Sequence, residues 1–289
     1  MDDKARTRAV VAAIAAAVMF AFMDTIAKEL ARSIATIQVA WARYAFHAIA
    51  VLAVLLYKRQ SILLTRERIG LQLLQSLCLL ASTIAMYQAL QQIPLAMATT
   101  LQFASPFFVV LISVVLLREE QSWLKLGVTV TGVIGVAIMV RPSGDLQAAT
   151  VLPVLSALFM AAYYVVTKKL SAHNGRSATL FLMAAIPTVM LTLFAPFWWH
   201  VPTLREVGLM MTLGVMGAVG HGLILYSFQY AESSSLAPYL YIQVLVSGLI
   251  GLVYLHEPIT TQFLLGGGVI LTSSAILRIS QRSMATTVR

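Results

Sequence analysis

The sequence predicts an all-α integral membrane protein, in which ten transmembrane helices form two inverted five-helix repeats around a central cavity. Hydrophobic residues make up 60% of the 289-residue chain and charged residues only 11%, whereas soluble domains carry roughly 25% charged residues. The long apolar segments fall into two matching sets of five, and an odd number of spans turns the second half upside down relative to the first. Inverted halves are typical of secondary transporters.

Each apolar segment is close to the length of about 20 residues that a helix needs to cross the hydrocarbon core. Connectors such as 91–94 and 232–235 are short, which predicts antiparallel neighbouring helices. The first repeat is assigned to 9–142 and the second to 149–280, with a cytoplasmic segment at 1–8 and a cytoplasmic tail at 281–289. The predicted spans are 9–30, 35–57, 69–91, 94–117, 122–140, 151–169, 178–198, 206–230, 234–255 and 260–280.

Most of the 20 Lys and Arg residues fall on the side of the membrane that holds both chain termini. Because cytoplasmic loops carry the excess of positive charge, we expect both termini in the cytoplasm and a multi-pass protein of the bacterial inner membrane. The formal net charge of +9 follows from this topology, so nucleic acid is not an expected partner. The single cysteine, Cys78, lies within an apolar segment and has no intrachain partner for a disulfide.

The two halves share weak sequence similarity. The segment FMDTIAKEL (22–30) aligns with AAYYVVTKKL (161–170), and Glu119 and Glu257 end the fourth and ninth spans in the same way. A Gly-rich segment follows each of these glutamates. Self-similarity at a fixed period, combined with matched numbers of spans, indicates an internal repeat.

These features resemble a known family. Besides the paired halves, QVAWARYAFH (38–47) and IPLAMATTLQFASPFFVVLISVVLLREE (93–120) are similar to segments of the drug/metabolite transporter superfamily, and within it of the EamA-type exporters. The resemblance covers nearly the whole chain and implies export of amino acids, aromatic ones included. Other branches of the superfamily carry S-adenosylmethionine, nucleotide sugars, sugar phosphates or cationic drugs.

Charged residues within the spans are candidates for substrate binding or ion coupling, because such groups are costly in lipid. Asp24 lies about ten residues before the first outer turn and Arg43 about nine after it, so the two share a depth in an antiparallel hairpin. The simpler interpretation is a structural ion pair. Alternatively, Asp24 carries a proton or Arg43 contacts a substrate carboxylate. Lys28, one turn after Asp24, either competes for that acid or extends to the membrane surface.

Two histidines complete this group of intramembrane polar residues. His47 lies one turn after Arg43, and His221 lies within the eighth span. Histidine changes charge near neutral pH, so each is either a buried hydrogen-bonded residue or part of a proton relay. No acid or thiol recurs at ligand spacing around them, so no metal site is expected.

Aromatic and amide side chains lie in the middle of several spans. Aromatic faces with a few amides suit an amphiphilic substrate that has one apolar part and one polar head. The alternative is ordinary helix packing. The candidate substrate-binding residues are Trp41, Tyr44, Tyr87, Gln88, Gln102, Tyr163, Tyr226, Tyr239, Tyr241 and Gln243.

Proline and glycine residues within the spans are candidate hinges for alternating access. Pro106 and Pro187 remove backbone hydrogen bonds in mid-span, and Gly217 and Gly248 give small faces that let helices approach closely. A static kink and tight packing are the simpler interpretations.

Together these observations predict a secondary transporter that exports amino acids, aromatic and other neutral ones, or similar small amphiphilic metabolites by alternating access. The alternative within transport is a carrier of S-adenosylmethionine or a nucleotide-type metabolite. An intramembrane enzyme would need a motif such as HExxH or GxSxG, which the sequence lacks. No catalytic residue, metal or cofactor is expected. The expected partners are a small-molecule substrate and the lipid bilayer, in a monomer or weak dimer.

Overall fold

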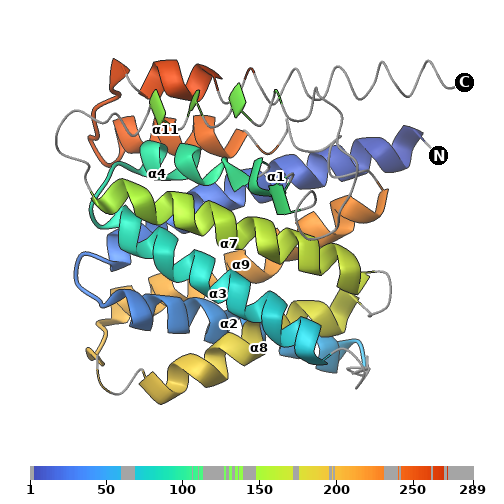
Figure 1. The fold of residues 1–289 in the computed structure, drawn as a ribbon. Coiled ribbons are helices and arrows are strands. Elements are labelled where there is room, and N and C mark those ends of the chain that lie inside the picture. Colours follow the sequence, from blue (N-terminus) through green and yellow to red (C-terminus); the bar gives the residue numbers. More distant parts are fainter. Residues whose placement is uncertain are drawn as a thin grey trace, which may run out of the picture.

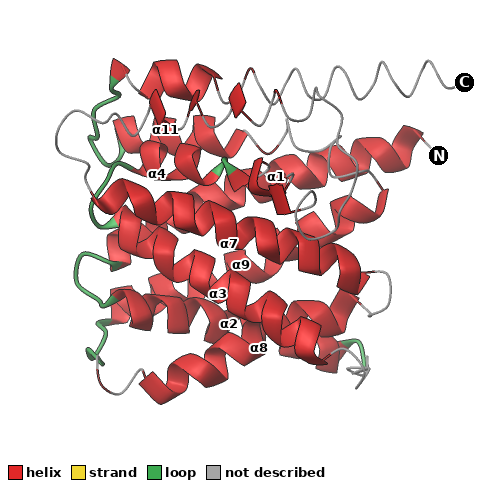
Figure 2. Cartoon of the chain, in the orientation of Figure 1, coloured by secondary structure: helices red, strands yellow, loops and turns green. Residues whose placement is uncertain are grey.

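The fold is described from a computed structural model. The structure describes residues 3–59, 69–105, 107–109, 111–112, 148–171, 176–194, 199–230, 242–261 and 263–269, and the single positions 127, 130, 131, 134, 135, 137, 138, 197, 240 and 272. In these residues the secondary structure is helical and no strand occurs (Figure 2). The helices are α1 (Asp3–Leu30), α2 (Thr36–Tyr57), α3 (Ile69–Leu90), α4 (Leu95–Gln102), α7 (Ala148–Ser171), α8 (Arg176–Phe194), α9 (Leu204–Tyr230) and α11 (Ile242–Val253).

Six helices in the described part are long and apolar enough to cross a membrane: α1, α2, α3, α7, α8 and α9. Their bounds agree with the predicted spans to within a few residues, except that α1 begins earlier, at Asp3. Large apolar side chains such as Leu56, Val189 and Leu193 are exposed on these helices, as expected where lipid is the solvent. The protein is therefore a multi-pass, all-α membrane protein, while the full set of ten spans and their inverted symmetry stay predictions.

The helices lie roughly along one direction, with sequence neighbours antiparallel (Figure 1). One end of the bundle holds the α1–α2 turn, the α3–α4 turn and the connection from α8 to α9, and we call it the α1–α2 end. The N-terminus of the chain lies at the opposite end. α1 ends and α7 begins at the α1–α2 end, so the first helices of the two sequence halves run in opposite directions.

Among the described helices, packing between the two sequence halves is more extensive than packing within either half. α3 packs against α7, α1 against α9 and α11, α2 against α8 and α9, and α4 against α7 and α11. Small and polar residues mediate the α3–α7 contact: the Ser82 and Ser156 hydroxyls lie 2.9 Å apart, and each lies within hydrogen-bond distance of the other's carbonyl oxygen. Small residues of this kind let transmembrane helices approach closely.

α4 is shorter than the predicted span 94–117, because the helix is interrupted after Gln102. The Phe103 amide donates to the carbonyls of Thr99 and Thr100, and the Ala104 amide donates to Leu101, which tightens the last turn. Helical structure resumes at Ser105. The predicted hinge residue Pro106 lies outside the described residues. Pro187 lies inside α8, Gly217 inside α9 and Gly248 inside α11, and their role as hinges stays a prediction.

Candidate substrate cavity

A cavity lies between the two sequence halves, lined by residues of α1, α2, α3, α4, α7, α9 and α11. It contains about 730 Å³ of space between protein atoms, with the open solvent at its mouth included. Sites for small molecules typically combine apolar walls with a few polar groups. Here Phe20, Met86 and Tyr164 supply apolar surface, while Asp24 and Arg43 supply charge.

The cavity brings together a large part of the predicted site. The predicted residues that line it are Asp24, Arg43, Tyr87, Gln102, Tyr163, His221 and Gln243. Sequence reasoning did not select Phe20, Ser82 or Thr83, which also line it. Thr83 lies four residues before Tyr87, so a search for polar residues on the same helix face would have found it.

Four of the described residues that were predicted to bind substrate do not line this cavity: Trp41, Gln88, Tyr226 and Tyr44, of which Tyr44 is described with Arg43 below. The Trp41 indole donates to the Thr192 hydroxyl at 2.9 Å. Gln88 accepts a hydrogen bond from Thr36 at 2.9 Å. The ring of Tyr226 packs on Tyr230 with centroids 4.9 Å apart. The predicted residues Tyr239 and Tyr241 lie outside the described residues.

Arg43, on α2, is buried with 4% of its surface exposed. Its Nη1 donates to the hydroxyls of Thr83 and Tyr44, and its Nη2 lies 3.1 Å from Nε2 of His221. Tyr44 does not line the cavity but supports this contact, since its hydroxyl also donates to the Leu79 carbonyl at 3.1 Å. Three helices, α2, α3 and α9, thus hold the guanidinium in place.

Asp24, on α1, faces the same cavity, and its Oδ2 accepts a hydrogen bond from Nε2 of Gln243 at 3.0 Å. Asp24 and Arg43 interact electrostatically, but no nitrogen of Arg43 lies within 4.0 Å of a carboxylate oxygen of Asp24, so the predicted direct ion pair does not form. Lys28 does not compete for Asp24 either, because its ammonium is bound to Glu257. The hydrogen-bond partner of Asp24 is therefore the neutral amide of Gln243, and neither Arg43 nor Lys28 binds it directly.

The two predicted histidines lie next to each other. Their rings stack with centroids 6.0 Å apart, and His221 also contacts Phe20 and Tyr163. His47 does not line the cavity, and its Nε2 is buried without a hydrogen-bond partner in the described structure. A Cβ at Gly217 would lie 3.4 Å from Nδ1 of His47, which is an ordinary van der Waals contact, so α9 packs directly against His47 at this position.

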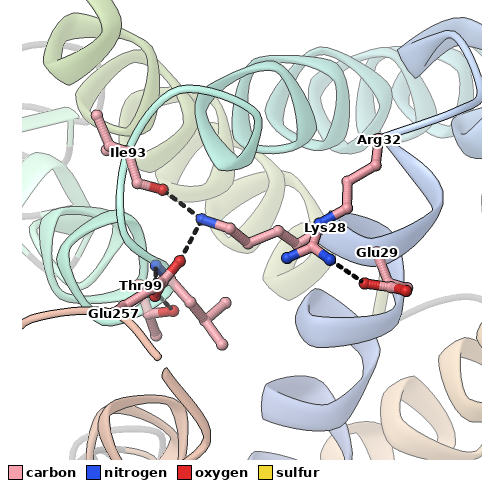
Figure 3. Close-up of polar contacts among 7 residues, drawn as sticks. Lys28, Glu29, Arg32, Ile93, Thr99 and Glu257 are labelled. Atoms are coloured by element: carbon pink, nitrogen blue, oxygen red, sulfur yellow. Dashed lines mark hydrogen bonds and ion pairs between the residues drawn. The ribbon is translucent and has the colours of Figure 1, made fainter. Parts of the chain in front are cut away.

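Lys28 and Glu257 join the two halves at the α1–α2 end (Figure 3). The Lys28 ammonium lies 2.6 Å from Oε1 of Glu257 and donates to the Ile93 carbonyl at 2.6 Å. Oε2 of Glu257 accepts from the Leu95 amide at 2.7 Å, and this amide belongs to the first turn of α4. Glu257 therefore caps α4 from the other half, where a carboxylate is also favoured by the helix dipole. We call these four residues the end latch.

Further polar contacts join the halves at the same end. Gln38 and His200 exchange two hydrogen bonds, of 2.7 and 2.8 Å, between the Gln38 amide and the His200 backbone. Arg205 lies 3.2 Å from Glu29 in an exposed ion pair. Together with the end latch, these contacts hold the two halves together at the α1–α2 end.

The chain matches the model of the EamA-like transporter family twice, over residues 7–141 and 147–279. A solved crystal structure covers 96% of this chain and 99% of its own with a TM-score of 0.69 at 14% sequence identity. At this identity the likeness shows the fold alone.

Three similar proteins are named as transporters. The S-adenosylmethionine uptake transporter of Rickettsia bellii is 26% identical over 260 residues, which are 90% of this chain and 89% of the relative. The pseudopaline exporter CntI of Pseudomonas aeruginosa is 27% identical over 277 residues, 92% of this chain and 94% of the relative. The riboflavin transporter of Vibrio cholerae is 28% identical over 239 residues, 80% of each chain.

Proposed function

This chain belongs to the EamA-like transporter family, and we propose that it exports amino acids, aromatic and other neutral ones, or similar amphiphilic metabolites. The observation that carries this proposal is the cavity between the halves. Its aromatic walls, which include Phe20, Tyr163 and Tyr164, suit an apolar group, while Arg43, Gln102 and Gln243 suit a polar head.

The mechanism we propose is alternating access between two repeats, 9–142 and 149–280. The double match to one family model supports this division, as does the packing of each half mainly on the other. With both termini in the cytoplasm of a bacterium, the α1–α2 end faces outward. The end latch then closes the outer side, and export requires its release so that the cavity opens there.

The energy source we propose is an ion gradient or the substrate gradient itself. The sequence contains no GxxxxGK[ST] motif for binding ATP phosphates. Asp24, His47 and His221 are the predicted groups through which protons would couple to transport, since all three are buried within the spans. An imposed pH gradient separates proton coupling from facilitated diffusion.

S-adenosylmethionine is the second candidate substrate, and one observation favours it. A relative named as an S-adenosylmethionine uptake transporter aligns over 90% of this chain. S-adenosylmethionine carries an amino-acid group at one end and an adenine at the other, so it also combines a polar head with an aromatic part. On this alternative, the aromatic walls of the cavity stack on the adenine and transport runs inward.

Transport of labelled solutes into proteoliposomes tests the proposal. The panel is Phe, Trp, Met, Thr, S-adenosylmethionine and a nucleotide sugar, each with and without an imposed pH gradient. We expect saturable movement of amino acids, which Tyr87→Ala in the cavity lowers and Tyr226→Ala outside it leaves unchanged. Movement of S-adenosylmethionine alone would select the second candidate. Rates equal to those of protein-free liposomes for the whole panel would contradict the proposed function.

A further inference from the structure

The buried guanidinium of Arg43 has no acid in direct contact within the described part of the chain, because the Asp24 carboxylate, with which it interacts electrostatically, lies more than 4.0 Å away. Its contacts are the hydroxyls of Thr83 and Tyr44 and the imidazole of His221, none of which is an acid. A charge buried without an opposite charge carries a large desolvation cost. A ligand that brings a negative charge into the cavity would offset this cost.

Two hydrogen-bond donors at this place are unused. Nε of Arg43 and the hydroxyl of Tyr87 are both buried, and neither has a hydrogen-bond partner among the described residues. Both side chains line the cavity, and the Arg43 guanidinium carbon lies 5.9 Å from the centre of the Tyr87 ring. Buried polar groups are rarely left unpaired in folded proteins. A carboxylate has two oxygens, and can accept from both donors in charge-assisted hydrogen bonds.

Asp24, on the neighbouring helix α1, is a buried acid that has no positively charged group in direct contact among the described residues. It is 4% exposed, and its described partner is the neutral amide of Gln243, which uses only Oδ2. In the described structure no Lys, Arg or His lies within 4.0 Å of this carboxylate. Lys28, one turn away on α1, is held by Glu257 instead. One cavity therefore contains an acid and a base, and neither has an oppositely charged group in direct contact among the described residues.

We infer that this cavity binds a zwitterionic amino-acid group, with the ligand carboxylate at Arg43 Nε and the Tyr87 hydroxyl and the ligand ammonium at Asp24. This inference rests on the proposed function and assigns the charge-recognising residues of its site. Such a ligand gives both charges a direct partner at once, whereas a simple anion or a simple cation contacts one and leaves the other without a direct partner. The rest of the ligand lies against Phe20, Tyr163 and Tyr164.

Calorimetric binding to the purified full-length protein tests the inference with matched ligands. L-phenylalanine carries both charges, L-phenylalaninol lacks the carboxylate, and phenylpropanoate lacks the ammonium. S-adenosylhomocysteine and methylthioadenosine, which is the same type of thioether without the amino-acid group, accompany S-adenosylmethionine as a second series. In at least one of the two series we expect the zwitterion to bind at least about tenfold more tightly than the analogues without the full amino-acid group, because each such analogue loses a charge-assisted interaction. Equal affinities within both series, or no binding of any probe, would overturn the inference.

Variants assign each charge to its residue. Arg43→Gln and Tyr87→Phe are expected to lower the affinity for L-phenylalanine but not for L-phenylalaninol, and Asp24→Asn to lower it for L-phenylalanine but not for phenylpropanoate. Where S-adenosylmethionine is the zwitterion that binds, the same variants should lower its affinity and leave that of methylthioadenosine unchanged. Tyr87→Phe removes a hydroxyl that has no hydrogen-bond partner among the described residues, so it should leave the melting temperature unchanged or raise it. This variant keeps the test valid where a charge variant fails to fold. A Tyr87→Phe protein that binds every ligand as the wild type does would contradict the carboxylate assignment.

The binding and transport experiments together distinguish failure of the zwitterion site from failure of the proposed transport function. A protein that transports a panel solute but binds the matched analogues equally well would leave the transporter function in place and remove the zwitterion site. A protein that binds the zwitterion selectively but moves no panel solute would keep the site and contradict the transport proposal.

Discussion

Glu257→Gln is expected to release the α1–α2 end of the bundle. The carboxylate holds the Lys28 ammonium at 2.6 Å and the Leu95 amide at 2.7 Å, and an amide side chain replaces both charge-assisted contacts by neutral ones. The Lys28 and Glu257 side chains are only 14% and 15% exposed, so water compensates little. We expect the closed state to lose about 1.5–3 kcal/mol, which is roughly a ten- to hundredfold change in its population relative to the open state.

Labelling of a cysteine in the cavity measures this release. Ile224→Cys places the thiol in the cavity, and Cys78→Ser removes the single native cysteine. In proteoliposomes, a membrane-impermeant thiol reagent should react faster from the α1–α2 side in the Glu257→Gln protein. Arg205→Gln is the matched control, because its ion pair with Glu29 lies at the same end but Arg205 is 71% exposed and such pairs contribute little. Equal labelling rates in the two variants would contradict a closing role for the end latch.

Gly214→Ala is expected to separate α2 from α9 and to destabilise the fold. A Cβ at this position would lie 2.8 Å from the backbone nitrogen of His47 and 2.9 Å from the carbonyl carbon of Phe46. Backbone atoms cannot rotate away as the end of a side chain can, so the helices have to move. Overpacking of this kind typically costs about 1–3 kcal/mol. The displaced segment of α2 includes His47, one turn from Arg43, so substrate binding should fall as well.

Gly208→Ala is the matched control for this prediction. Gly208 lies on the same helix, and a Cβ there would meet no atom within 4 Å. Alanine has the higher helix propensity, by about 1 kcal/mol, so Gly208→Ala should leave the melting temperature in detergent unchanged or raise it. Equal melting temperatures for the two variants would show that α2 and α9 do not pack as closely as described.

Composition and segment length were sufficient to predict the all-α membrane fold, because a chain with so few charges cannot stay soluble. Counting residues from the first turn also placed Asp24 and Arg43 at one depth, and both line the cavity. The hydrogen-bond partner of Asp24 could not be predicted in the same way. Gln243, the partner of Asp24, is 219 residues away in sequence, and only the packing of α1 on α11 brings the two together.

The direction in which a side chain faces was the main limit on predicting the site. Trp41 and Arg43 are two residues apart on α2, which separates them by about 200° around a helix. Arg43 therefore faces the cavity while Trp41 faces Thr192 and Trp199. Apolar periodicity does not settle this rotation when a helix is surrounded by apolar lipid and apolar neighbours. The partner of Lys28 could not be predicted for a similar reason, because its contact with Glu257 depends on the fold of the other half.

Protection of the cavity by substrate tests the central claim most directly. In the Cys78→Ser background, Ile224→Cys reports on the cavity and Leu204→Cys, 90% exposed at the start of α9, reports on the surface. The solute that the proteoliposome panel identifies should slow labelling of the thiol at position 224 in a saturable manner and leave the thiol at position 204 unaffected. If that solute is transported while labelling at position 224 stays unchanged, the substrate binds elsewhere and the cavity between Asp24 and Arg43 is not its site.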